Sequence, residues 1–316
     1  MARKHLRNHA DVRTLGFIGL YYALLLSEWL FVPLEARFVV PLVIATASLS
    51  WLCAVIAHNA LHCPLFERSW ENSVFQLMLT CAYGFAVSEY IPGHNLSHHM
   101  HTQGPADVIR TSKTPFVRFN FLNLFYFFPR VGADVVVQNY RFVAASKGRL
   151  VRWRNQLLVE VIACWATKIA LLIVDWRRAL IFVVLPHLWA LYGITTVNFL
   201  QHDGCDETHP VNHSRNFVGR IFNWFTFNNG FHGAHHDQPG LHWSLLAEAH
   251  RERFRGAIAP ELEQPSLFVY MVKTFVFPGR RQRYDGRRIL AVRAEPDEEW
   301  IPVRLQMGDD QAPRAG

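Results

Sequence analysis

Long apolar runs alternate with short polar breaks along the chain. One run extends from about Leu15 to Leu34, and a second extends from about Phe38 to Ala57. Two further runs cover about Leu157 to Val174 and Ala179 to Leu200, with the break Asp175-Trp-Arg-Arg178 between them. Each run approaches the roughly 20 residues that a helix needs to cross a bilayer. The pattern therefore predicts an all-α, multi-pass membrane protein with about four transmembrane helices arranged as two hairpins.

Another apolar run, from about Ser73 to Pro92, contains Glu89. A single crossing here would place His58 and His62 on the opposite side of the membrane from the later histidines. We therefore interpret this run as a buried or re-entrant segment. The aromatic stretch Phe116–Phe128 is too short to span and indicates an interfacial segment. A signal peptide is not favoured for the first run, since its apolar part is too long and no small-residue cleavage site follows it.

Composition supports the membrane interpretation. Apolar residues make up 51% of the chain and charged residues only 18%, below the quarter typical of soluble domains. The net charge of +7 fits an anionic membrane surface better than nucleic acid, because nucleic-acid binders seldom carry several apolar runs of this length. The five cysteines form no CxxC pair and indicate neither a disulfide framework nor a zinc knuckle. We expect a basic N-terminus (1–13), a membrane domain (14–278) and a polar C-terminal tail (279–316).

The basic residues predict an orientation. If both hairpins span, their outer loops hold only Arg37, Arg177 and Arg178, and nearly all other lysines and arginines lie on the opposite side. The positive-inside rule makes that common side the cytoplasm. The sequence thus predicts an integral membrane protein with its polar clusters facing the cytoplasm, in the inner membrane if the protein is bacterial.

The most unusual feature is the clustering of the 17 histidines. Four clusters follow apolar segments: His58-Asn-Ala-Leu-His62, His94-Asn-Leu-Ser-His98-His99, Asn198-Phe-Leu-Gln-His202 and His232-Gly-Ala-His235-His236. Because positions i, i+3 and i+4 share one face of an α-helix, we expect each i, i+4 pair to point one way. The i, i+4 pairs are His58 and His62, His94 and His98, Asn198 and His202, and His232 and His236.

The number of clustered histidines indicates the kind of metal site. Imidazole suits zinc, copper, iron and nickel. Nine histidines are too many for one tetrahedral zinc, and they suit two ions with four or five nitrogen ligands each. Asn198 could complete one sphere directly or through a water, and Asp107 and Asp203 could orient ligand imidazoles. No HExxH, Glu-x-x-His, GxSxG or Walker A motif is present in the sequence.

In order and spacing, these clusters resemble the histidine boxes of the membrane fatty acid desaturase superfamily, which also includes alkane hydroxylases. Asn212-His-Ser-Arg-Asn216 and the stretch from His232 to Trp243 look especially like bacterial fatty acid desaturases. The resemblance covers about residues 38–245. It implies that two iron ions are bound by the following residues: His58, His62, His94, His98, His99, His202, His232, His235 and His236.

The resemblance further implies an activity. It implies that O2 is activated at the reduced iron pair and that hydrogen is then taken from an unactivated C–H bond of a lipid acyl chain. Electrons are expected from a separate donor, such as a ferredoxin, a rubredoxin or a b-type cytochrome with its reductase. Membrane lipid is an expected partner and nucleic acid is not.

Two alternatives stay open. Family members often space the second box as HxxHH, whereas this chain has the HxxxHH that alkane hydroxylases use, so a hydroxylase of alkyl chains is the alternative within the superfamily. The alternative of another class is a histidine-rich metal transporter or sensor. Transport is disfavoured because only Glu28, Glu160, Lys168 and His187 interrupt the predicted spans.

The remaining histidines and the basic residues near the C-terminus have less specific interpretations. We expect His187 to hydrogen-bond a neighbouring helix, His5 and His9 to be solvated, and the others to lie at the surface or behind the ligands: His101, His209, His213, His242 and His250. The basic residues Lys273, Arg280, Arg281, Arg283, Arg287 and Arg288 could be a cytoplasmic flank, a contact for anionic lipid or a dock for an acidic electron donor.

Overall fold

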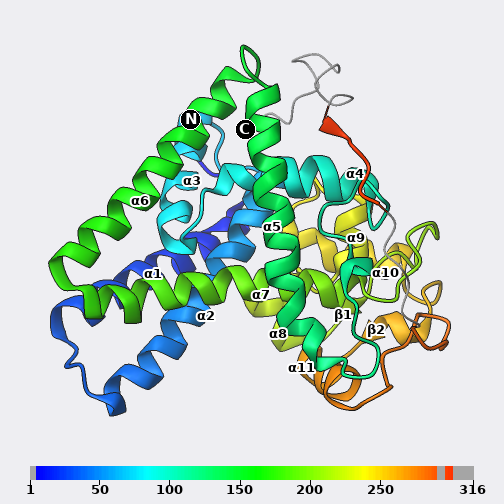
Figure 1. Cartoon of the computed structure of the whole chain (residues 1–316). Coiled ribbons are helices and arrows are strands. Elements are labelled where there is room, and N and C mark those ends of the chain that lie inside the picture. The colour runs from blue at the N-terminus through cyan, green and yellow to red at the C-terminus, as the bar shows by residue number, and fades with distance from the viewer. Residues whose placement is uncertain (1–4, 290–295, 302–316) are drawn as a thin grey trace. The chain divides into compact units, whose positions relative to one another are not determined.

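The protein is mostly helical and divides into two compact units (Figure 1). The computed structural model describes residues 5–289 and 296–301. The first unit contains the described residues up to Tyr90 and those from Gly148 to Ile194, and the second contains Ile91–Lys147 and the described residues from Thr195 onward. The first four residues and much of the C-terminal tail predicted over 279–316 lie outside the described ranges.

The first unit consists of helices. It contains η1 (His9–Asp11), α1 (Val12–Phe31), α2 (Ala36–His62), α3 (Ser69–Tyr83), η2 (Val87–Glu89), α6 (Val151–Ala179), η5 (Leu180–Val184) and the first half of α7 (Leu185–His202). In this unit α2 contacts both α1 and α3, and α3 contacts α6. The two predicted hairpins correspond to α1 with α2 and to α6 with α7.

Local sequence explains where these helices end. Helix α3 ends at Gly84, whose φ of 92° is left-handed and whose N–H bonds the carbonyl of Thr80. A Cβ at this position would lie 2.2 Å from the ring of His187, so only glycine fits. Asp175 has a non-helical backbone (φ −154°, ψ 94°), and its carboxylate accepts hydrogen bonds from the N–H groups of Arg177 and Arg178 at 3.1 Å. Asp175 therefore ends one helix and caps the next.

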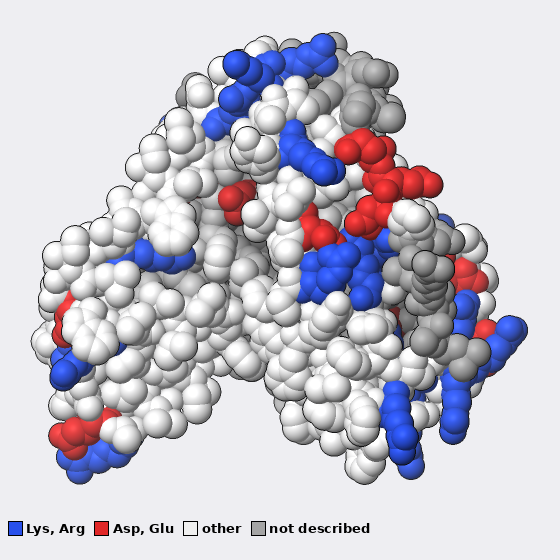
Figure 2. Space-filling model, in the orientation of Figure 1, with Lys and Arg blue, Asp and Glu red and all other residues white. Residues whose placement is uncertain are grey.

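Length and composition identify the membrane spans. Among the described residues, three helical segments are long and apolar enough to cross a bilayer: His9–Phe31, Ala36–His62 and Val151–His202. The last has 52 residues, more than twice what one crossing needs, and it bends at Asp175, which lies inside α6. In Figure 2, broad uncharged surfaces cover the region of α1, α2 and α6, as expected for helices that face lipid. The prediction of an all-α membrane protein with about four transmembrane helices is confirmed.

The segment predicted to be re-entrant is strongly bent. Ser69–Tyr83 and Val87–His101 pass the same length and composition test only as a pair, and their axes differ by 92°. A straight crossing by this segment is thereby excluded. That it does not cross the membrane at all stays a prediction.

Two buried ionisable residues of the first unit, His187 and Glu160, have hydrogen-bond partners on neighbouring elements. The predicted contact of His187 with a neighbouring helix is confirmed, since its Nε2 lies 3.1 Å from the hydroxyl of Tyr21 on α1. The buried carboxylate of Glu160 accepts hydrogen bonds from the backbone N–H of Ser88 at 2.7 Å and from Gln156 Nε2 at 2.8 Å. Such pairing is required where no water can solvate a polar group.

The second unit is built around α5 and an aromatic core. Its elements are η3 (Ile91–His98), α4 (His99–His101), η4 (Thr111–Lys113), α5 (Phe121–Ala145), the end of α7, β1 (Asn216–Phe217), α8 (Arg220–Phe225), α9 (His232–Asp237), η6 (Trp243–Leu245), α10 (Leu246–Arg253), η7 (Pro260–Leu262), β2 (Glu263–Gln264), α11 (Leu267–Met271) and η8 (Val272–Val276). The strands pair in parallel, with Asn216 opposite Glu263. Phe127, Phe199, Phe217 and Phe275 fill the core. Because α5 carries Phe127 and α7 carries Phe199, this core fixes the end of α7 within the unit.

Described parts of the predicted tail pack against this unit. Arg281 is 6% exposed, Trp300 is 3% exposed, and the ring of Trp300 stacks on Phe142 of α5 at 5.8 Å between centroids. These residues are part of the fold rather than a separate solvated extension.

Candidate metal centre

Four histidines of the second unit form one set. His98, His202, His232 and His236 each direct one ring nitrogen into a common space, and these nitrogens lie within 4.8 Å of one another. His202 Nε2 lies 2.9 Å from His232 Nε2 and 3.1 Å from His236 Nε2. We call these residues the four-histidine set.

The set fits a metal ion better than hydrogen bonding alone. A ring nitrogen carries either one proton or one lone pair, so His202 Nε2 cannot pair well with two other Nε2 atoms. His98 Nε2 is buried and, among the described residues, has no hydrogen-bond partner. Two nitrogens bound to one ion at about 2.1 Å and at a right angle lie ~3.0 Å apart, close to the spacings seen here. The geometry and the all-imidazole donors therefore suit a transition metal.

A second group lies in the same unit and comprises His94, His99 and His235. His99 Nε2 is 3.0 Å from His94 Nε2 and 3.1 Å from His235 Nε2, so His99 occupies the centre of this three-histidine set. His235 and His236 are adjacent in sequence yet belong to different sets. Helix α9 thus contributes to both groups.

A π-helix determines how the second box is divided. We expected His94 and His98 to point one way, as i and i+4 do in an α-helix; their rings do stack, with centroids 5.3 Å apart, but the two residues belong to different sets. Ile91–His98 forms a π-helix, whose wider turn joins residues five apart. His94 therefore shares a set with His99, and His98 belongs to the four-histidine set. In α9, which is an ordinary α-helix, His232 and His236 do share a set as expected.

The first box lies in the first unit. His58 and His62 occupy the last two turns of α2, and their ring centroids are 5.2 Å apart. Their i, i+4 spacing on an α-helix places both rings on one face, as the sequence predicted.

A buried carboxylate orients one ring of the four-histidine set. Asp107 Oδ2 lies 2.8 Å from His98 Nδ1, and both side chains are fully buried. Burial alone would raise the pKa of Asp107, but His98 and the N–H groups of Gln103 and Ile109 hold that pKa below its usual value. An ionised Asp107 accepts a hydrogen bond from the Nδ1–H of His98. The proton stays on Nδ1, so the Nε2 lone pair is directed into the set.

The other rings are held by weaker contacts. The Nδ1 of His202 donates to the carbonyl of His213 at 3.3 Å. Burial, followed by the neighbouring rings of His99 and His232, lowers the pKa of His236 well below its usual value. A neutral imidazole is the form that binds a metal.

Two residues of the motif Asn212-His-Ser-Arg-Asn216 hold the helices that carry the ligands. The guanidinium of Arg215 donates to the carbonyl of Leu200 in the last turn of α7 at 2.9 Å and to the carbonyl of Asp203, just past that helix, at 2.8 Å. Such carbonyls at a helix end have no partner within the helix. Asn216 Oδ1 accepts the N–H of Gly233 in the first turn of α9 at 2.9 Å. The sequence singled out this motif only as a resemblance, and its position between two ligand clusters is the signal that could have suggested such a role.

The remaining predicted site residues lie close to these sets without belonging to them. Asn198 Nδ2 is buried and has no hydrogen-bond partner among the described residues. Asn198 lies one turn before His202, and its role as a metal ligand stays a prediction. Asp203 contacts no ligand imidazole in the described structure; it forms an ion pair with Arg281, whose Nε lies 2.7 Å from Asp203 Oδ2. None of the five histidines expected outside the ligands belongs to either set of the second unit: His101, His209, His213, His242 and His250.

Comparison with known proteins agrees with this site. A family model described as Fatty acid desaturase matches residues 35–262, well over half of the chain and every histidine cluster. No curated protein matches the chain.

Proposed function

The chain belongs to the fatty acid desaturase family of membrane di-iron oxidoreductases, and we propose that it desaturates a lipid acyl chain with O2 at two irons. One observation carries the proposal: the second unit brings histidines from the second box, the third box and the end of α7 into two all-imidazole sets. Neutral nitrogen ligands leave the positive charge on the metal. An all-imidazole donor set suits iron among other transition metals, and the family makes iron the metal that we propose.

We propose that the four-histidine set holds one iron. His94, His99 and His235, with His58 and His62 of the first box, are proposed to hold the other, and Asn198 is a candidate ligand through a water. When bound, the irons supply O2 activation and hydrogen abstraction from an unactivated C–H bond. In the balanced reaction, O2 is reduced to water. Half of the electrons for this reduction come from the two C–H bonds that are broken, and half come from a separate donor.

The protein's own residues hold and orient the ligands. Asp107 accepts the hydrogen bond from the Nδ1–H of His98, and Arg215 and Asn216 hold the end of α7 and the start of α9. The four-histidine set is buried, apart from the half-buried His236, so bulk water is largely excluded from it. Hydroxylation is the second candidate, because the second box has the HxxxHH spacing of alkane hydroxylases and the same ligands serve both reactions.

The experiment is expression in a host with a simple lipid profile, followed by mass spectrometry of total fatty acids and measurement of iron in the purified protein. The inactive variant is His98→Ala/His99→Ala, which removes one ligand from each set. The matched control is His5→Ala/His9→Ala, which changes two exposed histidines outside both sets.

We expect about two irons per chain and a new unsaturated acid from the wild type and the control, with both lost in the inactive variant. A hydroxylated chain in place of an unsaturated one would support the second candidate. An iron-loaded protein that changes no acyl or alkyl chain would contradict the proposed substrate class.

A further inference from the structure

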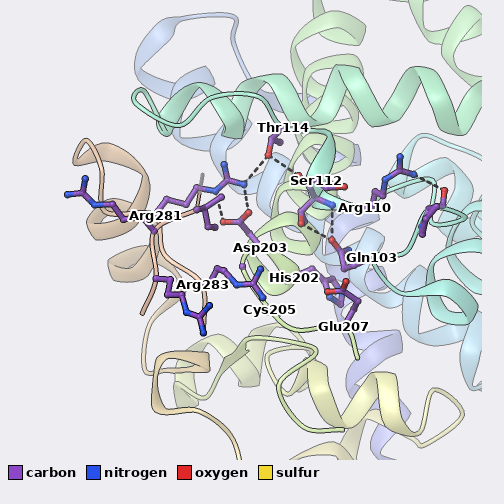
Figure 3. A pocket seen from close by; sticks show the side chains of 16 residues that line it. Gln103, Arg110, Ser112, Thr114, His202, Asp203, Cys205, Glu207, Arg281 and Arg283 are labelled. Atoms are coloured by element: carbon purple, nitrogen blue, oxygen red, sulfur yellow. Dashed lines mark hydrogen bonds and ion pairs between the residues drawn. The ribbon is translucent and has the colours of Figure 1, made fainter. Parts of the chain in front are cut away.

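A basic pocket lies beside the four-histidine set, entirely within the second unit (Figure 3). Its volume is about 550 Å³, within the range of small-molecule sites. Two acids, Asp203 and Glu207, and five arginines line it: Arg110, Arg281, Arg283, Arg287 and Arg288. His202 forms part of the wall, so the pocket reaches a residue of the proposed metal site.

A short hairpin presents three of these arginines. Gln282 and Arg288 form an antiparallel bridge, the N–H of Arg283 bonds the carbonyl of Arg287 at 2.8 Å, and Gly286 turns the chain with a φ of 79°. The N–H of Tyr284 bonds the carbonyl of Gly204 at 2.8 Å, and its hydroxyl bonds Asp206 at 2.8 Å. The hairpin is thereby tied to the loop that directly follows His202.

Contacts with acids divide the arginines into anchored and available ones. Arg281 forms a two-point ion pair with Asp203 and also bonds Thr114, and Arg110 pairs with Asp297. Arg283 and Arg287 share a single acid, Asp285, at 4.0 Å and 3.1 Å. Within the described residues, Arg288 has no carboxylate at ion-pair distance. Counting only the described residues, the hairpin therefore carries more positive than negative charge at the pocket.

The chemistry of the lining indicates the kind of ligand. Among the described residues that line the pocket, only Pro105, Cys205 and Ile289 offer apolar side chains, too few to cover an acyl chain. A guanidinium presents parallel N–H groups that match the oxygens of a phosphate. We propose that this pocket binds a phosphate group on the polar carrier of the acyl substrate, next to His202. The link to an acyl substrate rests on the proposed function, whereas phosphate binding itself does not.

The test is calorimetric titration of the iron-loaded protein in detergent with three probes: inorganic pyrophosphate, coenzyme A and phosphatidylglycerol in mixed micelles. The pocket variant is Arg283→Gln/Arg287→Gln, which changes exposed side chains. The matched control is Arg251→Gln/Arg255→Gln, which removes the same charge from exposed positions outside the pocket. Arg283→Lys/Arg287→Lys keeps the charge without the planar fork.

We expect at least one probe to bind the wild type and the control equally, and to bind the pocket variant about tenfold or more weakly, with the lysine variant in between. Preference for coenzyme A would identify a thioester carrier and preference for phosphatidylglycerol a lipid head group, while pyrophosphate alone would indicate a free-phosphate site.

The proposal would be overturned if the control lost as much affinity for the probe as the pocket variant, or if no probe bound the wild type. If in that case the pocket variant slowed reduction by an acidic electron-transfer protein, the surface would be a protein dock instead. The titration measures binding without turnover. A protein that binds phosphate but oxidises no acyl chain would therefore contradict the proposed function and leave the phosphate site standing.

Discussion

Asp107 is a buried carboxylate that contacts one ring of the four-histidine set. Its carboxylate lies 2.8 Å from His98 Nδ1 and has no solvent exposure. In Asp107→Asn, the amide can still contact the ring but no longer supplies a negative charge. We expect iron affinity to fall by about 10- to 100-fold, as for other residues that orient metal-bound imidazoles. Competition with an iron chelator measures this.

The control for that variant is Asp134→Asn, the same chemical change at a carboxylate that pairs with Lys113 and Arg130 and belongs to neither histidine set. The chelator concentration that removes half of the iron from this control should equal that of the wild type. Equal midpoints for Asp107→Asn and the wild type would show that Asp107 has no part in holding His98.

Asp134 itself predicts a pH dependence of stability. Burial alone would raise its pKa, but hydrogen bonds from Lys113 and Arg130 lower it below the usual value. A carboxyl with a lowered folded-state pKa stabilises the fold above its unfolded pKa, and the contribution is lost as pH falls through the folded pKa. Below about pH 4, the melting temperature of the wild type should therefore fall more steeply than that of Asp134→Asn. Parallel profiles in detergent would show that this ion pair contributes nothing.

At the scale of elements, the buried side chain of Arg215 adds to the aromatic core in holding the end of α7. Arg215 is 2% exposed, bonds two terminal carbonyls of the helix, and lies 4.4 Å above the ring of Tyr270. In Arg215→Met the length is kept, but two buried carbonyls lose their partner. We expect a loss of about 1–3 kcal/mol in the free energy of unfolding, together with lower iron content.

Arg251→Met is the matched variant, because Arg251 is exposed on α10. Its unfolding free energy in detergent and its iron content should both equal those of the wild type. A stable Arg215→Met protein with full iron content would mean that other contacts suffice to hold His202 in place.

Some elements could be predicted from sequence and others could not, for physical reasons. The spans were predictable because length and apolar composition are local properties, and Asp175 marked the break inside the longest segment. The division of the second box between two sets could not be predicted. The same sequence over Ile91–His98 could form an α-helix or a π-helix, and the two differ in backbone hydrogen bonds and in residues per turn, which the sequence pattern does not show. The roles of Arg215 and Asn216 depend on contacts with α7 and α9, which spacing along the chain does not reveal.

At the scale of the whole molecule, the distribution of arginines predicts one orientation. The break between α1 and α2 and the break at Asp175 are expected outside, and both termini and the histidine clusters are expected in the cytoplasm. Epitope tags at either terminus should resist protease in intact cells, whereas a tag inserted at 32–35 should be cleaved. Cleavage of a terminal tag instead would show that the orientation is opposite to the predicted one.

The control for orientation is a chain in which the outer loop is made basic by Glu35→Arg. Added positive charge there opposes the predicted topology, so a fraction of the inserted tags should become protected. An unchanged pattern would mean that the remaining basic residues dominate the insertion.

The π-helix of the second box also has a consequence for the gene that encodes it. One extra codon in an α-helical segment can be absorbed as a single wide turn, which keeps the residues on either side in register. His94 and His99 face each other across such a turn. Deletion of Leu96, which is half-buried, would shorten the box to HxxHH and bring the same two imidazoles four residues apart on an ordinary α-helical turn. We therefore expect the in-frame deletion to keep iron, so that HxxHH and HxxxHH are two lengths of one site, related by a single insertion.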